Sequence, residues 1–297
     1  MAVLLKGEPV AAALRKKIRA EVSALARPPR LAILMAGESA ASRRYVERKC
    51  DAAAEVGIGT ELCALPAGAG RREILQLLNH WNEDDSIDGV LVQAPLPDRS
   101  LEDEVFGAVD PAKDVDGFHP HNVGLLALGQ KDGLIPCTPK GILYLLEAYG
   151  IPIAGRRIVI IGRSRIVGLP LALLLQSRGL DGTVTLCHSR TAHLREIARE
   201  ADLLISAVGS PNLVRAGWIR EGATVVDVGQ NFFSDPSSVG GRRLLGDVDF
   251  SVVAPHCGAI TPVPGGVGPM TVASLLENVL LARQRGAAKS LQPSADA

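Results

Sequence analysis

Residues 158–168 read Ile-Val-Ile-Ile-Gly-Arg-Ser-Arg-Ile-Val-Gly, and this stretch decides the fold class. The run Ile158–Ile161 predicts a buried strand, and Gly162 and Gly168 bound a loop that leads into an apolar helical segment. A strand that passes through a glycine turn into a helix is typical of a dinucleotide-binding unit, where a pyrophosphate lies at the helix N-terminus. Ser164 replaces the usual second glycine and the last glycine comes one residue late. An ordinary strand-to-helix turn therefore remains an alternative.

Strand-like and helix-like segments alternate on both sides of this stretch. We expect strands at residues 31–35, 60–65, 89–95, 157–161, 183–187, 203–208 and 224–228. Helices are expected at residues 42–56, 72–81 and 194–200, and from residue 168 onward. Such alternation is typical of βα units with parallel sheets, so the fold class is α/β.

The length of 297 residues and a proline-rich region before residue 139 predict two α/β domains. We expect an N-terminal domain of residues 1–139, completed by a C-terminal helix at residues 270–286 that returns to it. Residues 140–269 then form the Rossmann-like domain.

The composition excludes several classes of protein. Thirty-two basic and thirty-two acidic residues cancel, so we expect no nucleic-acid partner. The longest nearly apolar run, at residues 166–175, is too short to span a membrane. The first eight residues are too short and too charged for a signal-peptide core. The five cysteines are widely spaced and form no C-x-x-C pair, which favours free thiols and a cytoplasmic protein.

The strand that follows the glycine turn predicts which dinucleotide binds. It ends in Leu186-Cys-His-Ser-Arg-Thr191, without the acidic residue that an NAD site offers to the ribose. Ser189, Arg190 and Arg163 instead supply hydroxyl and guanidinium donors, which favour a 2′-phosphate and hence NADP. For Arg190 alone, a solvated loop cation is an equally good interpretation.

The N-terminal domain has two places where polar side chains meet an apolar pattern. Tyr45 and Lys49 are four residues apart, so on a helix they share one face and could stack a flat ring beside an amine. Spacing alone favours a surface pair over this function. Gln93 ends an otherwise apolar strand, where α/β sheets place ligand contacts, although a plain loop amide fits equally well.

The segment 114–119, Asp-Val-Asp-Gly-Phe-His, sets two carboxylates beside a glycine turn. A carboxylate at the edge of a cleft could accept two N–H groups from an aminopyrimidine-like ring. An Asx turn with solvated charges is the ordinary alternative. His119 and His121 have no third ligand in register, so we expect no metal. Ser164 lacks the second flanking glycine of a hydrolase elbow, which makes it a poor candidate nucleophile.

Six strings, taken in order, resemble one family, the bifunctional methylenetetrahydrofolate dehydrogenase/methenyltetrahydrofolate cyclohydrolases. The resemblance covers roughly Leu4 to Ala282. The strings are YVERK (45–49), GVLVQAPLP (89–97), KDVDGFH (113–119), PCTPKG (136–141), GRSRIVG (162–168) and PVPGGVGP (262–269).

The resemblance implies a role for each matching residue. It makes Lys49 the catalytic lysine, Tyr45 the aromatic that stacks on the folate, and Gln93 the hydrogen-bond partner near the lysine. Asp116 becomes the carboxylate that holds the pterin. Further implied substrate contacts are Val92, Ala94, Pro264, Gly265 and Gly266, the last three in a loop that closes over the substrate. The implied NADP contacts are Gly162, Arg163, Ser164, Gly168, Ser189, Arg190 and Gln230.

The same resemblance implies tetrahydrofolate one-carbon derivatives as substrates, a homodimer and a link to purine biosynthesis. Hydride transfer from 5,10-methylenetetrahydrofolate needs mainly orientation, whereas hydrolysis of the methenyl product benefits from a base, for which Lys49 is the candidate. Gln230 departs from the isoleucine that the family usually has beside the cofactor.

Three other functions remain to be weighed. A monofunctional dehydrogenase would be expected to have changed Lys49 or Gln93, and both are present. A non-catalytic nucleotide-binding protein would not need these residues together with Tyr45 and Asp116. A generic NADP dehydrogenase for another small substrate accounts for the second domain but not for the first.

Overall fold

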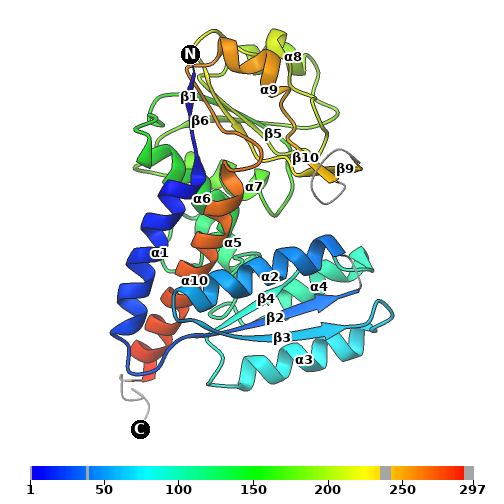
Figure 1. Ribbon diagram of the computed structural model, residues 1–297, viewed down its shortest axis with the longest axis vertical. Coiled ribbons are helices and arrows are strands. Elements are labelled where there is room, and N and C mark those ends of the chain that lie inside the picture. Colours follow the sequence, from blue (N-terminus) through cyan, green and yellow to red (C-terminus); the bar gives the residue numbers. More distant parts are fainter. Residues whose placement is uncertain (1, 38–39, 235–241, 291–297) are drawn as a thin grey trace. The chain divides into compact units, whose positions relative to one another are not determined.

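The computed structural model describes residues 2–37, 40–234 and 242–290. The chain divides into two compact units. The six-stranded unit contains residues 1–11 and 138–271, and the three-stranded unit contains residues 12–137 and 272–297. Both sheets are parallel, which confirms the α/β class (Figure 1).

The three-stranded unit is built on strands in the order β3-β2-β4, with β2 in the centre. The strands are β2 (Arg30–Ala36), β3 (Gly59–Leu65) and β4 (Gly89–Val92). Two helices, α2 (Ala40–Glu55) and α3 (Arg71–Glu83), connect them and lie on opposite sides of this sheet (Figure 1).

The side chains of β2 alternate between two cores. Leu31, Ile33 and Met35 pack in the core that contains residues of α2, whereas Ala32 and Leu34 pack with residues of α3. This is the period of two that a pleated strand imposes. Because both faces are covered, the strand shows as a continuous apolar run in the sequence.

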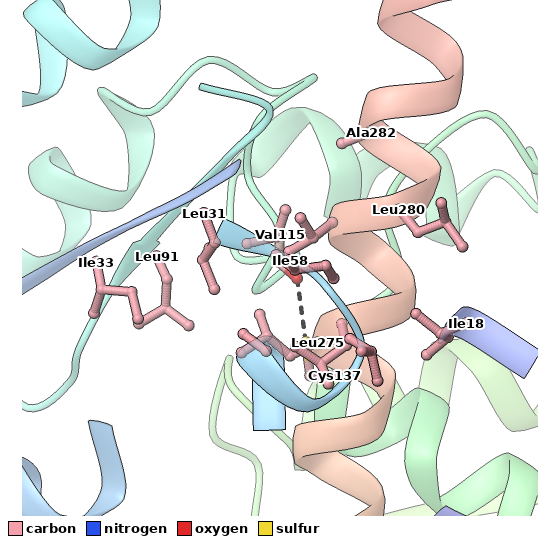
Figure 2. Packing of buried hydrophobic residues seen from close by; sticks show 14 of the residues in the cluster. Ile18, Leu31, Ile33, Ile58, Leu91, Val115, Cys137, Leu275, Leu280 and Ala282 are labelled. Carbon is pink, nitrogen blue, oxygen red and sulfur yellow. Dashed lines mark hydrogen bonds between the residues drawn. The ribbon is translucent and has the colours of Figure 1, made fainter. Parts of the chain in front are cut away.

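The C-terminal helix α10 (Val267–Ser290) completes the core on the α2 side. Leu275 and Leu280 of this helix pack in one cluster with Ile18 of α1 (Gly7–Ser23) and with strand residues (Figure 2). The expected return of the C-terminal helix to the first sheet is confirmed. The helix begins at Val267, three residues before the expected start. Pro269 has no backbone N–H, but it fits in the first turn of the helix, where the N–H groups have no intrahelical partner.

Short helices fill the proline-rich segment between β4 and the second unit. They are η1 (Arg99–Leu101), α4 (Glu102–Gly107) and α5 (Pro120–Ala127). The helix α6 (Cys137–Ala148) then leads into the six-stranded unit.

The six-stranded sheet has the order β1-β11-β8-β7-β5-β6. Its strands are β1 (Val3–Leu4), β5 (Arg157–Ile161), β6 (Thr183–Cys187), β7 (Leu203–Ser206), β8 (Thr224–Asp227) and β11 (Ala259–Ile260). The expected domain of residues 1–139 includes Val3 and Leu4, whereas here these residues form an edge strand that pairs with β11.

Helices cover both faces of this sheet and two strands form a hairpin. The helices are α7 (Gly168–Leu175), α8 (Leu194–Arg199), α9 (Phe250–Val253), η2 (Ala216–Trp218) and η3 (Ala254–His256). The antiparallel hairpin consists of β9 (Asn231–Ser234) and β10 (Arg242–Leu245). Ile158 and Ile160 face one core and Val159 and Ile161 face the other.

Three expected strands are shorter in the structure. The strand expected at 89–95 ends at Val92, since Pro95 has no N–H for a ladder. The strand expected at 203–208 ends at Ser206, because the N–H of Val208 bonds to the Asp247 carboxylate. The strand expected at 224–228 ends at Asp227. None of the helices among the described residues is long and apolar enough to cross a membrane.

Candidate active site

Tyr45 and Lys49 lie on one face of α2, as their spacing predicts. The Nζ atom of Lys49 is 4.9 Å from the centre of the Tyr45 ring, within cation–π range. Lys49 is only 4% exposed, so the alternative of a solvated surface pair is wrong. A buried lysine has to be hydrogen-bonded, and its partner comes from another element.

That partner is Gln93, the first residue after β4. Its backbone N–H donates to the Leu34 carbonyl at 2.8 Å, which fixes the residue to the central strand. Its side-chain Oε1 accepts from Lys49 Nζ at 3.1 Å, and its Nε2 donates to the Ala94 carbonyl at 2.6 Å. The amide is therefore held at both ends, with its oxygen toward the amine. Val92 before it is buried in the sheet, and Ala94 after it is partly buried.

The two carboxylates of the segment 114–119 differ in burial and in hydrogen bonding. Asp114 is buried and accepts from the N–H groups of Gly117 and His119, at 3.1 and 2.8 Å, and from the Asn122 amide at 2.9 Å. It forms the Asx-type turn that was the ordinary interpretation of this segment. Asp116 is partly exposed, and this turn leaves its carboxylate outside the Asp114 network.

Asp116 lies close enough to the lysine for their charges to interact. Burial raises the pKa of Asp116, while the Lys49 charge and a hydrogen bond with the Cys137 thiol oppose the increase. Burial also raises the pKa of Tyr45, and the Asp116 charge adds to that increase. The tyrosine hydroxyl therefore stays protonated at neutral pH. We call the set Tyr45, Lys49, Gln93 and Asp116 the Lys49 cluster.

Two residues support the Lys49 cluster through partners that the sequence did not reveal. Asn278 of α10 is fully buried and donates to the carbonyls of Val115 and Ile135, at 2.9 Å each. Cys137 donates from Sγ to the Val115 carbonyl at 3.1 Å (Figure 2). The two bonds to the Val115 carbonyl fix the backbone immediately before Asp116. A helical period shows Asn278 only as a polar residue on an apolar face, which does not reveal its partners.

Other polar residues singled out in the sequence have structural roles. His119 caps α5, because its Nδ1 accepts from the His121 N–H at 3.0 Å. Lys113 donates to three carbonyls at the end of α3, at 2.8 to 3.0 Å, which satisfies groups that a helix C-terminus leaves open. Within the described ranges no group of three His, Cys, Asp or Glu side chains could hold a metal ion.

The glycine turn of the six-stranded unit is packed tightly against backbone carbonyls. Gly162 has a φ of +112°, and a side chain there would collide with the Ala207 carbonyl. A side chain at Gly168 would collide with the carbonyl of Gly162, so both positions need glycine. Ser164 lies between them and its hydroxyl accepts from the Val167 N–H at 3.2 Å. The turn is thus tight and leads directly into the start of α7.

The residues expected to bind the 2′-phosphate are solvent-exposed. Arg163 lies in the glycine turn, and Ser189 and Arg190 lie directly after β6. The N–H of Arg190 donates to His188 Nδ1 at 3.1 Å, which shapes this loop and leaves the guanidinium exposed. Gln230 is also exposed, and its Nε2 is the nearest atom to a side chain built at Gly268, at 3.8 Å.

The loop that carries Pro264, Gly265 and Gly266 also belongs to the six-stranded unit. Gly265 has a φ of +102°, and its carbonyl accepts from the Gly7 N–H at 2.8 Å. Gly266 is buried against Pro262, and Pro264 is exposed. The closure of this loop over a substrate stays a prediction.

Two domain models of one family match this chain. Residues 5–116 match the tetrahydrofolate dehydrogenase/cyclohydrolase catalytic domain, and residues 136–287 match the NAD(P)-binding domain of the same family. The chain is 47% identical to the Bifunctional protein FolD of Protochlamydia amoebophila over 94% of this chain and 97% of that protein.

Solved structures give the same result. The chain is similar to the FolD methylenetetrahydrofolate dehydrogenase/cyclohydrolase of Campylobacter jejuni, with a TM-score of 0.90, 42% identity, and coverage of 96% of this chain and 99% of that one. It is also similar to the Trypanosoma brucei enzyme complexed with NADP and an inhibitor, with a TM-score of 0.92 and 39% identity. That match covers 96% of this chain and 98% of the other.

Proposed function

Because the chain belongs to the tetrahydrofolate dehydrogenase/cyclohydrolase family, we propose that the Lys49 cluster is the site at which its two reactions occur. The protein oxidises 5,10-methylenetetrahydrofolate with NADP and hydrolyses the resulting 5,10-methenyltetrahydrofolate to 10-formyltetrahydrofolate. The observation that carries the assignment of the site is the buried amine of Lys49, held 3.1 Å from Gln93 Oε1 beside the ring of Tyr45.

Each member of the cluster has a task that suits its chemistry. The Tyr45 ring stacks on the flat pterin or on the adjoining aromatic ring of the folate. The carboxylate of Asp116 accepts N–H groups from the aminopyrimidine edge, and ionised acceptors make the stronger hydrogen bonds. Gln93 fixes the direction of the Lys49 amine. Tyr45 and Asp116 thereby orient the substrate, and Gln93 orients Lys49, before any bond changes.

Lys49 takes a proton from the water that attacks the methenyl carbon. The new C–O bond forms as this proton moves to Nζ. The bond from the carbon to the folate N5 then breaks, the new hydroxyl loses its proton to become the formyl carbonyl, and N5 takes up a proton, which gives the 10-formyl product. A positioned base of this kind contributes about 100-fold or more. Oxidation of the methylene bridge is pushed by a nitrogen lone pair of the folate, so the cluster contributes mainly orientation to that step.

The residues of the six-stranded unit fit NADP. The Gly162–Gly168 turn leads into the N-terminus of α7 and would receive the pyrophosphate, and exposed Arg163, Ser189 and Arg190 would hold the 2′-phosphate. NADP, when bound, accepts the hydride that leaves the methylene bridge. Gly168 and Gln230 complete the proposed cofactor contacts, and Pro264, Gly265 and Gly266 complete the substrate contacts together with Val92 and Ala94.

A spectrophotometric assay tests both activities on the purified chain. The methenyl absorbance should rise with methylenetetrahydrofolate only when NADP is added, and supplied methenyltetrahydrofolate should decay faster than in buffer. Lack of the second activity in folded protein would leave only a monofunctional dehydrogenase.

The proposal extends to the setting of the enzyme. We infer a cytoplasmic protein, supported by cysteines that are all free thiols within the described residues. The 10-formyl product fits a role in supplying one-carbon units for purine biosynthesis. Phe232 and Phe233 on β9 are 55% and 42% exposed, and such apolar side chains support a homodimer. Analytical ultracentrifugation tests the dimer, and a monomer at micromolar concentration would contradict it.

A further inference from the structure

We propose that Asp247 is a positioning residue for the cofactor, because its buried carboxylate holds the loop after β7 to the segment after β8. This inference rests on the proposed function. It assigns a task to a residue that lies outside both the Gly162–Gly168 turn and the loop of Pro264, Gly265 and Gly266. Asp247 is fully buried and follows β10 by two residues. A buried carboxylate needs several donors, and its donors identify what it orders.

The loop after β7 supplies most of these donors. The N–H groups of Val208, Gly209 and Ser210 donate to the two Asp247 oxygens at 2.8, 3.2 and 2.9 Å. Gly209 has a φ of +67°, and a left-handed residue within such a turn allows successive N–H groups to converge on one anion. The hydroxyl of Ser206, the last residue of β7, adds a bond at 3.3 Å.

A second loop is attached to the same carboxylate. Asn231, which begins β9 directly after Gln230, donates from Nδ2 to Asp247 Oδ1 at 3.0 Å. A side chain at Gly229 would collide with the Asp247 carboxylate, so the backbone after β8 passes directly against it. One carboxylate thus fixes two loops whose strands, β7 and β8, are neighbours in the sheet.

The backbone N–H of Asp247 is itself hydrogen-bonded to a second carboxylate. Asp227, the last residue of β8, accepts from the N–H groups of Gly229, Asp247 and Val248 at 2.9 Å each. Burial raises the pKa of Asp227 to about 6, against the effect of these three donors, and the Asp247 charge adds to the increase. Hydrogen bonds therefore fix both the carboxylate and the backbone N–H of Asp247.

These loops lie at the edge of the sheet where the cofactor is expected. In open α/β sheets, ligands bind beyond the carboxyl ends of the strands. The Ala207 carbonyl is the atom that a side chain at Gly162 would strike, so the loop after β7 adjoins the glycine turn. With three N–H groups directed at Asp247, this loop offers a ligand its carbonyl oxygens instead. Such acceptors suit the hydroxyl and amide groups of a nicotinamide riboside rather than its phosphates.

The test uses the fact that methenyltetrahydrofolate hydrolysis consumes no cofactor. Asp247→Asn places an amide among donors, so the NADP dissociation constant should rise about tenfold or more in titration calorimetry. The NADP Michaelis constant should rise with it, while hydrolysis of supplied methenyltetrahydrofolate stays within about twofold of wild type. Asp249→Asn is the matched control, since Asp249 bonds to Ser251 outside both loops, and it should bind NADP normally.

Asn231→Ala provides a milder variant in case Asp247→Asn does not fold. It removes one donor and leaves the carboxylate, so NADP binding should weaken by a few-fold. Unchanged NADP binding in either folded variant would overturn the inference, as would an equal loss of hydrolysis and NADP binding. Wild-type protein without either activity would instead refute the proposed function, which keeps the two failures distinct.

Discussion

Replacing Lys49 by methionine separates the two reactions that share the Lys49 cluster. Lys49 is 4% exposed, so its stem fills space in the protein, and methionine retains most of that volume while removing the amine. The lost group is the proposed base, whose removal costs hydrolysis about 100-fold or more, equivalent to about 2.7 kcal/mol in activation free energy. Dehydrogenation should fall less, because it requires orientation rather than a base.

The same substitution has a second consequence through Asp116. The Lys49 charge lowers the pKa of this carboxyl against the effect of burial, so without it the pKa rises further. A carboxyl with a higher pKa becomes protonated at a higher pH when the pH is lowered. The folate Michaelis constant, which depends on ionised Asp116, should therefore begin to rise at a higher pH in the variant than in wild type as the pH is lowered.

The assay follows the decay of supplied methenyltetrahydrofolate and its NADP-dependent formation, each over a series of pH values. Lys16→Met is the control, since Lys16 is an exposed lysine of α1, and both rates should stay at the wild-type level. NADP binding should be unchanged in both variants. Hydrolysis by Lys49→Met at a near wild-type rate would refute the assignment of the base, and another group would have to activate the water.

Three further predictions follow from individual contacts. Arg163→Ala should raise the NADP Michaelis constant about tenfold or more and leave that for NAD nearly unchanged, because only NADP carries the 2′-phosphate; equal effects would assign Arg163 to the loop fold. Asp116→Asn should chiefly raise the folate Michaelis constant in steady-state kinetics, by removing a charged acceptor, and an unchanged constant would exclude the pterin contact. Asn278→Leu leaves the buried Val115 carbonyl and the partly buried Ile135 carbonyl without their amide donor, which should lower the free energy of unfolding in urea by about 2–4 kcal/mol. Gln284→Leu, at an exposed position of the same helix, should change it little, and equal stabilities of the two variants would contradict the reasoning.

The sequence was sufficient to predict the helices and strands in which apolar residues follow a regular pattern. The strands at 157–161 and 183–187 have the expected bounds. The first is a buried apolar run, and the second, at the edge of the sheet, alternates threonine with apolar residues. The spacing of Tyr45 and Lys49 also predicted one face of a helix, and the colinear strings predicted the family that the comparisons then showed. Each of these properties is encoded within a few neighbouring residues.

Only the tertiary structure decided which polar residues work together. The sequence could not tell Asp114 from Asp116, because both precede the same glycine, and the difference comes from the amide of Asn122 and the turn it fixes. It also could not show that β1 pairs with β11, or that Asp247 holds the loop after β7. A hydrogen bond has no period along the chain, and its partner is set by the packing of distant segments. Local patterns therefore determined the elements, while the folded chain determined which donors each buried carboxylate and amide finds.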